Sequence, residues 1–379
     1  MKTTAKTAAL LTRTTMLSAA AISAFTLAAP AHSETPVVEA MIAAAKAEPP
    51  LQVYDSTGKI TEMADAFAAK YGLQAIGTKV KATAQVEMLL REARAGNVQG
   101  DVSIISDAPS VVGEVLPVGA AISYLPPDMA EKIPSQYQDP LVVVTTVNVW
   151  AFNAEQNETC PVSNIWELTE PKWRGHVAMQ DPLGKTIYTD WFNQMESQAD
   201  AAVAKAYADH FGKPLETDQA SATKAWVKAL AENGPLLGSS DSSAAEAVGS
   251  PGQTEAFMGM MSSAKFRDNV DGGLKLGLCS DMQPFLGFAN AGVGVIASGT
   301  DSPNAAKLFI RYVLTDEGIA PQAEDGKLSS NIDVGLPDSE PSGVGAVMDR
   351  VLPYQVAHAA SDWDTRQDWQ DFWRLNYRK

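Results

Sequence analysis

Apolar and polar positions along this chain switch repeatedly between the two-residue period of strands and the longer period of helices. Residues 51–55 form a short strand pattern that ends in a polar turn, and residues 60–71 then carry apolar side chains at helical spacing before Gly72. A second unit follows, with a helix that ends near Gly96 and a strand at residues 101–106. This alternation predicts an α/β fold with a largely parallel sheet.

The middle of the chain contains a long apolar strand pattern. Residues 140–155 are strongly β-forming, and Thr145 and Thr146 lie at their centre. A strand of this length is able to cross from one lobe of a protein to another. A further strand is expected at residues 176–181, and residues 276–298 contain a return strand.

Helical patterns fill most of the remaining chain. Helices are expected at residues 199–212 and 220–234. Residues 302–320 predict an amphipathic helix with Ser302 as its N-cap, Pro303 at its first position and Gly318 near its end. The aromatic and charged tail, residues 361–379, predicts a helix that packs on the body of the protein.

The N-terminus has the pattern of a secretory signal peptide. Its basic residues come first: Lys2, Lys6 and Arg13. The apolar run at residues 16–29 is shorter than the about 20 residues that cross a bilayer, and no cysteine follows it as in a lipoprotein. We expect residues 1–33 to be a signal peptide cleaved near Ala31 or Ser33, which leaves a soluble periplasmic protein.

Composition limits the partners and the number of domains. The chain has 379 residues and a formal net charge of −16, so it repels nucleic acid and anionic lipid at long range. Hydrophobic residues make up 45% of it, which is too many for a disordered chain. A mature chain of about 345 residues is too long for one hydrophobic core and predicts about two domains.

Cysteine and histidine are scarce. Cys160 and Cys279 are able to pair in an oxidising periplasm, and two isolated buried thiols are the alternative. Their spacing excludes a CxxC metal or redox site. The histidines of the mature chain also lack the spacing of a zinc motif. We therefore expect no metal site and no cofactor.

Four junctions between a strand and a helix share one chemistry. Each offers hydroxyls and backbone N–H groups at a helix start, where the helix dipole and unpaired donors attract anions. They are Asp55-Ser56-Thr57-Gly58, Ser106-Asp107, Asp181-Pro182-Leu183-Gly184-Lys185-Thr186 and Gly238-Ser239-Ser240-Asp241-Ser242-Ser243. Ordinary helix capping favours the same residue types and stays an alternative for each junction.

Catalytic motifs do not account for these junctions. DPLGKT, at residues 181–186, is similar to a phosphate loop but lacks the GxxxxGK[ST] spacing of nucleotide hydrolases. No GxSxG elbow is present, and a serine–histidine pair would have to form from the few histidines by chance geometry. We expect no enzymatic activity, and a secreted hydrolase is the alternative from another class.

Several motifs resemble one family of transport proteins. They are VYDSTGKITEMADAFAAKYG, GDVSIISD, EPKWRGHVAMQDP, and NAAKLFIRYVLTDEG followed by GKLSSNIDV. In this order they resemble the periplasmic solute-binding proteins of ABC importers, in the branch that binds ferric iron, phosphonates, sugar phosphates, thiamine and polyamines. The resemblance covers nearly the whole mature chain.

The resemblance implies a type 2 periplasmic-binding fold, in which two α/β lobes joined by crossing strands close on a ligand. Lobe one would be residues 34–144 together with 286–379, and lobe two would be residues 145–285. The protein would work as a monomer that delivers its ligand to an ABC permease in the inner membrane. A chemoreceptor partner is a further alternative.

The sequence leaves three classes of ligand open. Ferric binders of the family carry adjacent tyrosines, whose phenolates suit Fe(III), whereas Ser262 and Ser263 stand in that region here. A polyamine or thiamine-like cation would use the acidic residues with Tyr54 and Trp191. The hydroxyl-rich turns and Lys185 instead favour a phosphorylated or phosphonate organic anion.

The expected site has no catalytic residue and no metal ligand. Its ligand-binding residues come from the four junctions and from nearby aromatic and hydroxyl side chains. They are Tyr54, Ser56, Thr57, Ser106, Asp107, Thr145, Asp181, Gly184, Lys185, Thr186, Trp191, Ser239, Ser240, Asp241, Ser262 and Ser263.

Overall fold

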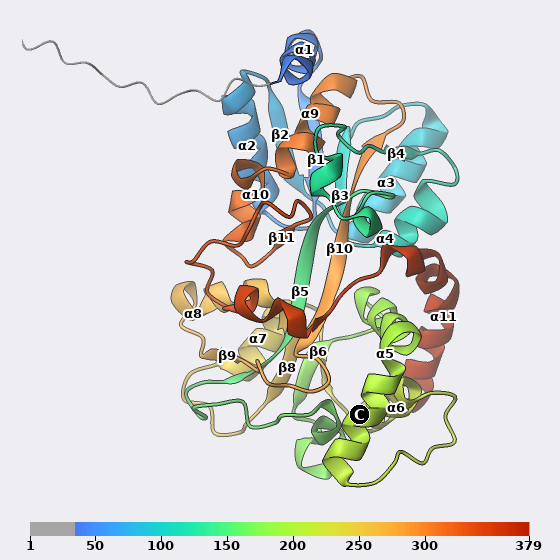
Figure 1. Ribbon diagram of the computed structural model, residues 1–379, viewed down its shortest axis with the longest axis vertical. Coiled ribbons are helices and arrows are strands. Elements are labelled where there is room, and N and C mark those ends of the chain that lie inside the picture. Colours follow the sequence, from blue (N-terminus) through green and yellow to red (C-terminus); the bar gives the residue numbers. More distant parts are fainter. Residues whose placement is uncertain (1–34, 379) are drawn as a thin grey trace, which may run out of the picture.

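The computed structural model describes residues 35–378, so the predicted signal peptide lies outside the described part of the chain. These residues form an elongated molecule in two lobes, through which one 12-stranded sheet runs (Figure 1). The strand order along the main path of this sheet is β2-β1-β3-β10-β5-β8-β6-β7. The predicted α/β class is confirmed.

The upper lobe in Figure 1 combines early and late parts of the chain. Its strands are β1 (Leu51–Asp55), β2 (Ala75–Lys79), β3 (Val102–Ile105) and β4 (Ala121–Ser123). Its helices are α1 (Pro36–Ala45), α2 (Lys59–Tyr71), α3 (Ala82–Ala95), α4 (Ala108–Ser110), α9 (Pro303–Val313) and α10 (Asp316–Ala323). Because β1 pairs in parallel with β2 and β3, the junctions after β1 and β3 meet at one edge of the sheet.

The lower lobe repeats this plan with the middle of the chain. Its strands are β6 (Val177–Gln180), β7 (Leu236–Gly238), β8 (Met258–Ser262) and β9 (Leu276–Leu278). Its helices are α5 (Ile187–Phe211), α6 (Ala222–Glu232), α7 (Asp241–Gly249) and α8 (Asp268–Asp271). β6 pairs in parallel with β7 and β8, so the junctions after β6 and β7 also share an edge.

Two long antiparallel strands connect the lobes. They are β5 (Val142–Asn153) and β10 (Gly287–Ala297). β5 also pairs with β8 and β9 below and with β11 (Leu328–Ser329) above. β10 pairs with β3 and β4 above and with β12 (Val351–Leu352) below. The crossing strand expected at residues 140–155 is therefore β5.

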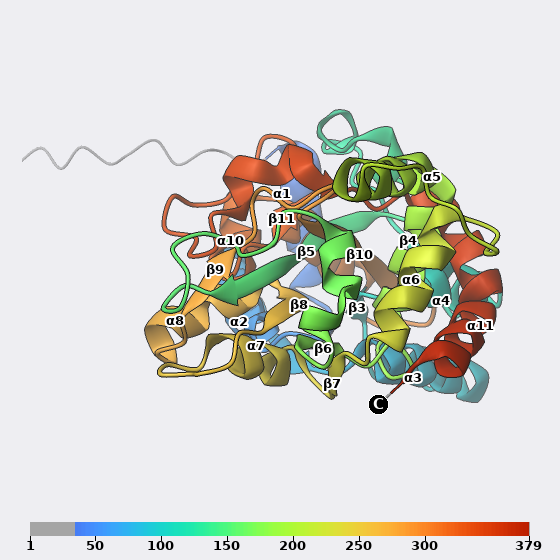
Figure 2. The same ribbon diagram turned by 90° about the horizontal axis from the view of Figure 1, so that it is seen from below.

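The C-terminal helix α11 (Ala359–Asn376) lies along one side of both lobes. It packs against α5 and α6 of the lower lobe and against α4 of the upper lobe (Figures 1 and 2). The tail is thus a helix on the body of the protein, as the sequence predicts. The boundaries of the lobes stay a prediction, and α11, counted there in lobe one, contacts both. Across residues 35–378, no helix has both the length and the apolar character needed to span a membrane.

Two helix predictions were wrong in their bounds. The helical pattern at residues 199–212 is the second half of α5, which begins at Ile187, where the junction at residues 181–186 predicts a helix start. The first turns of α5 are buried all round, which hides the helical period. The helix expected at residues 302–320 divides into α9 and α10, and Gly318 lies in the first turn of α10 instead of near the end of one helix.

The N-terminus of α9 is capped in a way that the sequence did not predict. Ser302 occupies the N-cap position, but its hydroxyl donates to the carbonyl of Pro49 at 3.0 Å. The carboxylate of Glu48 instead accepts from the backbone N–H groups of Asn304 at 3.0 Å and Ala305 at 2.8 Å. A cap supplied from about 250 residues away has no local sequence pattern.

Candidate ligand site

The predicted junctions of the two lobes face each other where the lobes meet. The hydroxyl of Thr186, at the start of α5, donates to the carboxylate of Asp107 after β3 at 3.3 Å. Lys185 lies close enough to Lys327 of the upper lobe to lower its pKa, although burial is the largest cause of that shift. We call the seven residues around this contact the polar interlobe cluster: Asp55, Lys185, Asp241, Ser263, Lys265, Gln322 and Lys327.

The upper lobe contributes a hydrogen-bonded chain to this cluster. Gln322 Nε2 donates to Asp55 Oδ2 at 2.7 Å, and Lys327 Nζ donates to Gln322 Oε1 at 3.0 Å. Asp55 Oδ1 accepts from the backbone N–H of Ser56 at 2.5 Å and of Thr57 at 3.4 Å. The carboxylate of Asp55 therefore closes its own turn and orients Gln322, which in turn holds Lys327.

The lower lobe contributes two more ammonium groups. Lys265 Nζ donates to Ser242 Oγ at 3.1 Å and forms an ion pair with Asp268 at 3.2 Å. The ammonium group of Lys185 forms no hydrogen bond and no ion pair with any residue of the described chain. Lys185 is half-buried at the turn before α5. Its charge acts on the buried carboxylate of Asp241, and its N–H donors have no hydrogen-bond acceptor among the described residues.

Two enclosed oxygen atoms of the lower lobe also lack a hydrogen-bond partner among the described residues. They are Asp241 Oδ1 and the hydroxyl of Ser263, whose residue is 0% exposed. Burial raises the pKa of Asp241, and the charges of Lys185 and Lys265 oppose that rise. Buried polar atoms are nearly always hydrogen-bonded in native proteins, so these two indicate a missing partner.

The lobes approach closely beside Ser263. A Cβ atom added to Gly326 of the upper lobe would lie 3.0 Å from Ser263 Oγ, and Gly326 has φ +75°. An L side chain at position 326 would therefore be strained and would also press on the lower lobe. This glycine allows the two walls of the site to meet.

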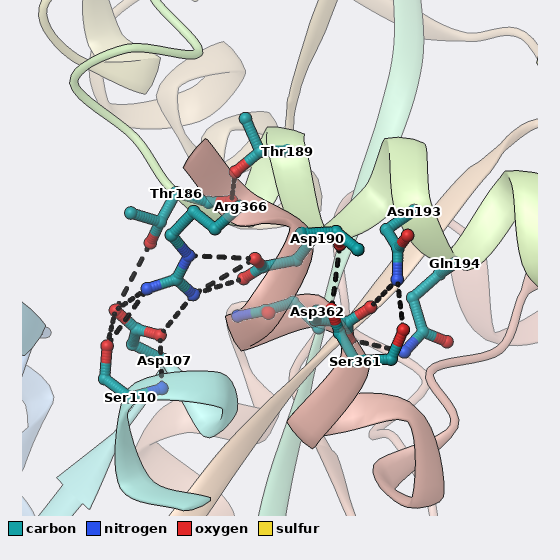
Figure 3. Close-up of polar contacts among 12 residues, drawn as sticks. Asp107, Ser110, Thr186, Thr189, Asp190, Asn193, Gln194, Ser361, Asp362 and Arg366 are labelled. Carbon is teal, nitrogen blue, oxygen red and sulfur yellow. Dashed lines mark hydrogen bonds and ion pairs between the residues drawn. The ribbon is translucent and has the colours of Figure 1, made fainter. Parts of the chain in front are cut away.

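Ion pairs connect the lobes on opposite sides of the molecule. Arg267, next to α8, pairs with Asp325, which follows α10. On the other side, Arg366 of α11 pairs with Asp107 at 2.7 Å and with Asp190 of α5 at 3.0 Å (Figure 3). Burial raises the pKa of Asp190 well above its usual range, against the lowering effect of Arg366.

Several predicted ligand residues have roles in capping and turns. Ser240 and Ser243 form a capping box at the start of α7, and Asp107 caps α4 by accepting from the N–H of Ser110. Ser262 accepts from the N–H of Ala264. For these positions the capping alternative describes the observed contacts.

The junction after β6 forms a tight turn. Asp181 Oδ1 accepts from the N–H of Leu183 at 3.0 Å, and the carbonyl of Asp181 accepts from Gly184 and Lys185, both at 2.9 Å. Thr186 stands at the N-cap of α5 but makes no side-chain cap, because its hydroxyl is turned to Asp107. The N-terminus of this 25-residue helix therefore has no side-chain cap and lies next to Lys185.

Three other predicted residues are not members of the polar interlobe cluster, although Thr145 lies opposite Leu328 of β11, next to Lys327. Trp191 is a core residue that stacks on Phe288 at 4.6 Å, and it lines a small pocket between α5, β10 and β12. Tyr54 packs over Gly100 on the α3 side of the sheet. Thr145 is half-buried on β5.

Two serines of the predicted set are held through their backbone carbonyl groups. The carbonyl of Ser106 accepts from Asn290 Nδ2 at 3.1 Å. The carbonyl of Ser239 accepts from Gln180 Nε2 at 3.5 Å. Neither contact uses the serine hydroxyl group on which the prediction of a ligand residue rested.

The two cysteines pair with each other. Cys160, after β5, and Cys279, after β9, form a disulfide within the lower lobe. In the described residues, no group of three or more His, Cys, Asp or Glu side chains is placed to hold a metal ion.

Sequence reasoning missed Gln322, Lys327, Lys265 and the arginines that join the lobes. Lys265 follows the expected serine pair by two residues, which is a weak local signal. Lys327 and Gln322 reach the site from the end of α10, more than 260 residues after Asp55. No spacing in one sequence indicates such a contact.

The chain matches one protein family over most of its length. Residues 51–326 match the model of the bacterial extracellular solute-binding proteins. No curated protein matches the chain by sequence.

Solved structures show the same fold. Iron-bound HitA from Pseudomonas aeruginosa has a TM-score of 0.63 and 16% identity, over 85% of this chain and 99% of that one. A substrate-binding protein of an ABC transporter from Agrobacterium tumefaciens has a TM-score of 0.67 and 14% identity, over 87% and 95%. AfuA from Actinobacillus pleuropneumoniae, with fructose-6-phosphate bound, has a TM-score of 0.63 and 19% identity, over 86% and 98%. These likenesses confirm the two-lobed fold and leave the ligand open.

Proposed function

Because this chain belongs to the bacterial extracellular solute-binding proteins, we propose that it is the periplasmic substrate-binding component of an ABC importer for a phosphorylated or phosphonate organic anion. The observation that carries this proposal is the unpaired ammonium of Lys185 between the lobes, with Lys265 and Lys327 close by. The residues named as lobe one (34–144 and 286–379) and lobe two (145–285) would close on this solute.

Electrostatics favours an anion over the other two classes of ligand. Burial is the largest cause that lowers the pKa of Lys327; the carboxylates of Asp55 and Asp325 raise it, and the charge of Lys185 lowers it. Gathering like charges in one partly buried place costs free energy, and a bound phosphate or phosphonate would remove that cost. Ferric iron or a polyamine would add positive charge to the same place. Ser262 and Ser263 also offer no phenolate to iron.

The unpartnered oxygen atoms support an organic anion in preference to free phosphate. Asp241 Oδ1 is acceptor-only when ionised, so its partner must bring a hydrogen-bond donor. Ser263 Oγ is able to donate or accept. A solute with a hydroxyl or amino group near its phosphorus would satisfy both atoms while its oxyanions meet the lysines.

The proposed cycle uses movement of the lobes around β5 and β10. The open protein would admit the solute, and closure would bring Lys185 and Lys327 to the same anionic group. The closed monomer would then dock on the permease. HitA is described with iron and AfuA with fructose-6-phosphate, so proteins of this fold take both kinds of ligand.

A thermal-shift screen of the dialysed mature protein tests the proposal. A ligand that binds the folded state stabilises it by about 2.7 kcal/mol at a concentration 100 times its Kd. We expect a raised melting temperature with sugar phosphates or phosphonates, and none with Fe(III), polyamines or thiamine. A shift with Fe(III) or a polyamine alone would reverse the ligand assignment and leave the fold unaffected.

A further inference from the structure

Arg366 is a mostly enclosed residue of α11 that holds groups from both lobes at once. Its Nη2 donates to Asp107 Oδ1 at 2.7 Å, and its Nη1 donates to Ser110 Oγ at 3.0 Å; both partners belong to the upper lobe. Nη2 also donates to Asp190 Oδ1 at 3.0 Å in the lower lobe. Figure 3 shows these contacts. The side chains of Arg366, Asp107 and Asp190 are 11%, 3% and 2% exposed.

The rest of α11 is attached mainly to the lower lobe. Trp373 stacks on Phe192 of α5 at 5.9 Å between ring centroids. Asp362 accepts from Asn193 Nδ2 and from Gln194 Nε2, each at 2.7 Å, and both donors lie on α5 (Figure 3). From these contacts we expect α11 to move with the lower lobe, although it lies within the range 286–379 that the sequence assigned to lobe one.

A second contact of α11 reaches the upper lobe close to Arg366. The ring of Trp363 lies directly on Gly113, because a Cβ atom there would be 2.4 Å from Trp363 Cγ. Trp363 and Arg366 also touch each other, with the guanidinium 5.5 Å from the ring centroid. The two side chains form one contact surface against α4 and the turn Val111–Val115 that follows it.

This helix lies beyond the residues that match the family model. The family match ends at residue 326, and α11 begins at Ala359. Arg366 thus joins Asp107, which lies within the matched region, to a segment outside it. Neither residue is a member of the polar interlobe cluster as defined above.

We propose that Arg366 is a positioning residue that latches the lobes in the closed state and thereby sets ligand affinity without touching the ligand. When the lobes separate, Arg366 stays with Asp190 on the lower lobe, and its contact with Asp107 breaks. The contact therefore exists in one of the two states and shifts the equilibrium between them. This inference does not depend on the solute's identity and goes beyond the proposed function.

The main test is the Asp107→Asn variant of the full mature protein without ligand. Asparagine caps helices as well as aspartate does, so α4 keeps its cap while the ion pair with Arg366 is lost. We expect the ratio of closed to open molecules to fall about ten-fold, as for the loss of one charge-assisted hydrogen-bonded pair. Small-angle X-ray scattering would show this as a larger radius of gyration. Arg366 itself is left in place, because Asp107 and Asp190 would otherwise lack their shared cation.

A second variant disturbs the neighbouring contact between Trp363 and Gly113 without changing any charge. Gly113→Ala places a methyl group against Trp363 and should also enlarge the radius of gyration. The matched control is Arg374→Gln, which removes another arginine of α11 whose ion pair with Asp371 is exposed, and it should leave the scattering unchanged. If both test variants scatter like the wild type, the latch is refuted, whatever the ligand screen shows.

Discussion

The Lys185→Ala variant should bind the anionic solute about 100-fold more weakly than the wild type, since truncating one partner of a buried charge pair costs about 2–5 kcal/mol. The ammonium group of Lys185 has no hydrogen bond or ion pair within the described chain, but its charge lowers the pKa of the buried carboxylate of Asp241. The loss would therefore fall mainly on binding, with a smaller loss of unfolding free energy because the charge of Asp241 is less compensated. Isothermal titration calorimetry with the solute that gives the largest thermal shift measures this.

The matched control for that experiment is Lys205→Ala. Lys205 is an exposed lysine of α5 whose side chain is 73% accessible and pairs with Asp209. Exposed pairs of this kind contribute about 0–1 kcal/mol, and this one lies away from the polar interlobe cluster. Equal affinities for the wild type and both variants would mean that the anion is bound elsewhere. A gain in affinity for Fe(III) or a polyamine in Lys185→Ala would instead identify a cationic ligand.

Removing the disulfide should lower the free energy of unfolding by about 4–5 kcal/mol, the value expected for a closed loop of about 100 residues. Cys160 and Cys279 are separated by 119 positions, so the bridge greatly restricts the unfolded chain. Cys279 is 0% exposed, and alanine is the suitable replacement because a serine hydroxyl would be buried there. Urea unfolding of the Cys160→Ala, Cys279→Ala double variant measures the loss.

The wild type in a reducing buffer is the comparison for that variant. Reduction removes the bridge while keeping both side chains, so the reduced protein should unfold at nearly the same urea concentration as the double variant. An unchanged urea midpoint in both samples would show that breaking the disulfide does not lower the free energy of the unfolded chain. A loss in the variant alone would assign the effect to packing around Cys279.

Part of the candidate site could be predicted from local sequence patterns, and the rest depends on tertiary contacts. The residues after β6 could be predicted as a binding turn from the sequence alone. A proline, a glycine, a lysine and a threonine at a strand–helix junction are typical of such a turn. Capping uses the same residue types, and sequence could not separate the two roles. The structure assigns Ser240 to a capping box and leaves Lys185 without a partner, which distinguishes them.

The sequence by itself determined the α/β class, the crossing strand and the family resemblance, because these follow from periodicity and from motif order along the chain. Gly72 shows the local case: it ends α2 with φ 64°, a conformation that glycine adopts at little cost. Only the tertiary structure decided which charges meet. Arg366 reaches Asp107 across 259 positions, and Gln322 reaches Asp55 across 267. Such contacts depend on how helices pack on the sheet. Packing depends on the shape and burial of side chains over the whole fold, so the spacing of residues along the chain does not predict it.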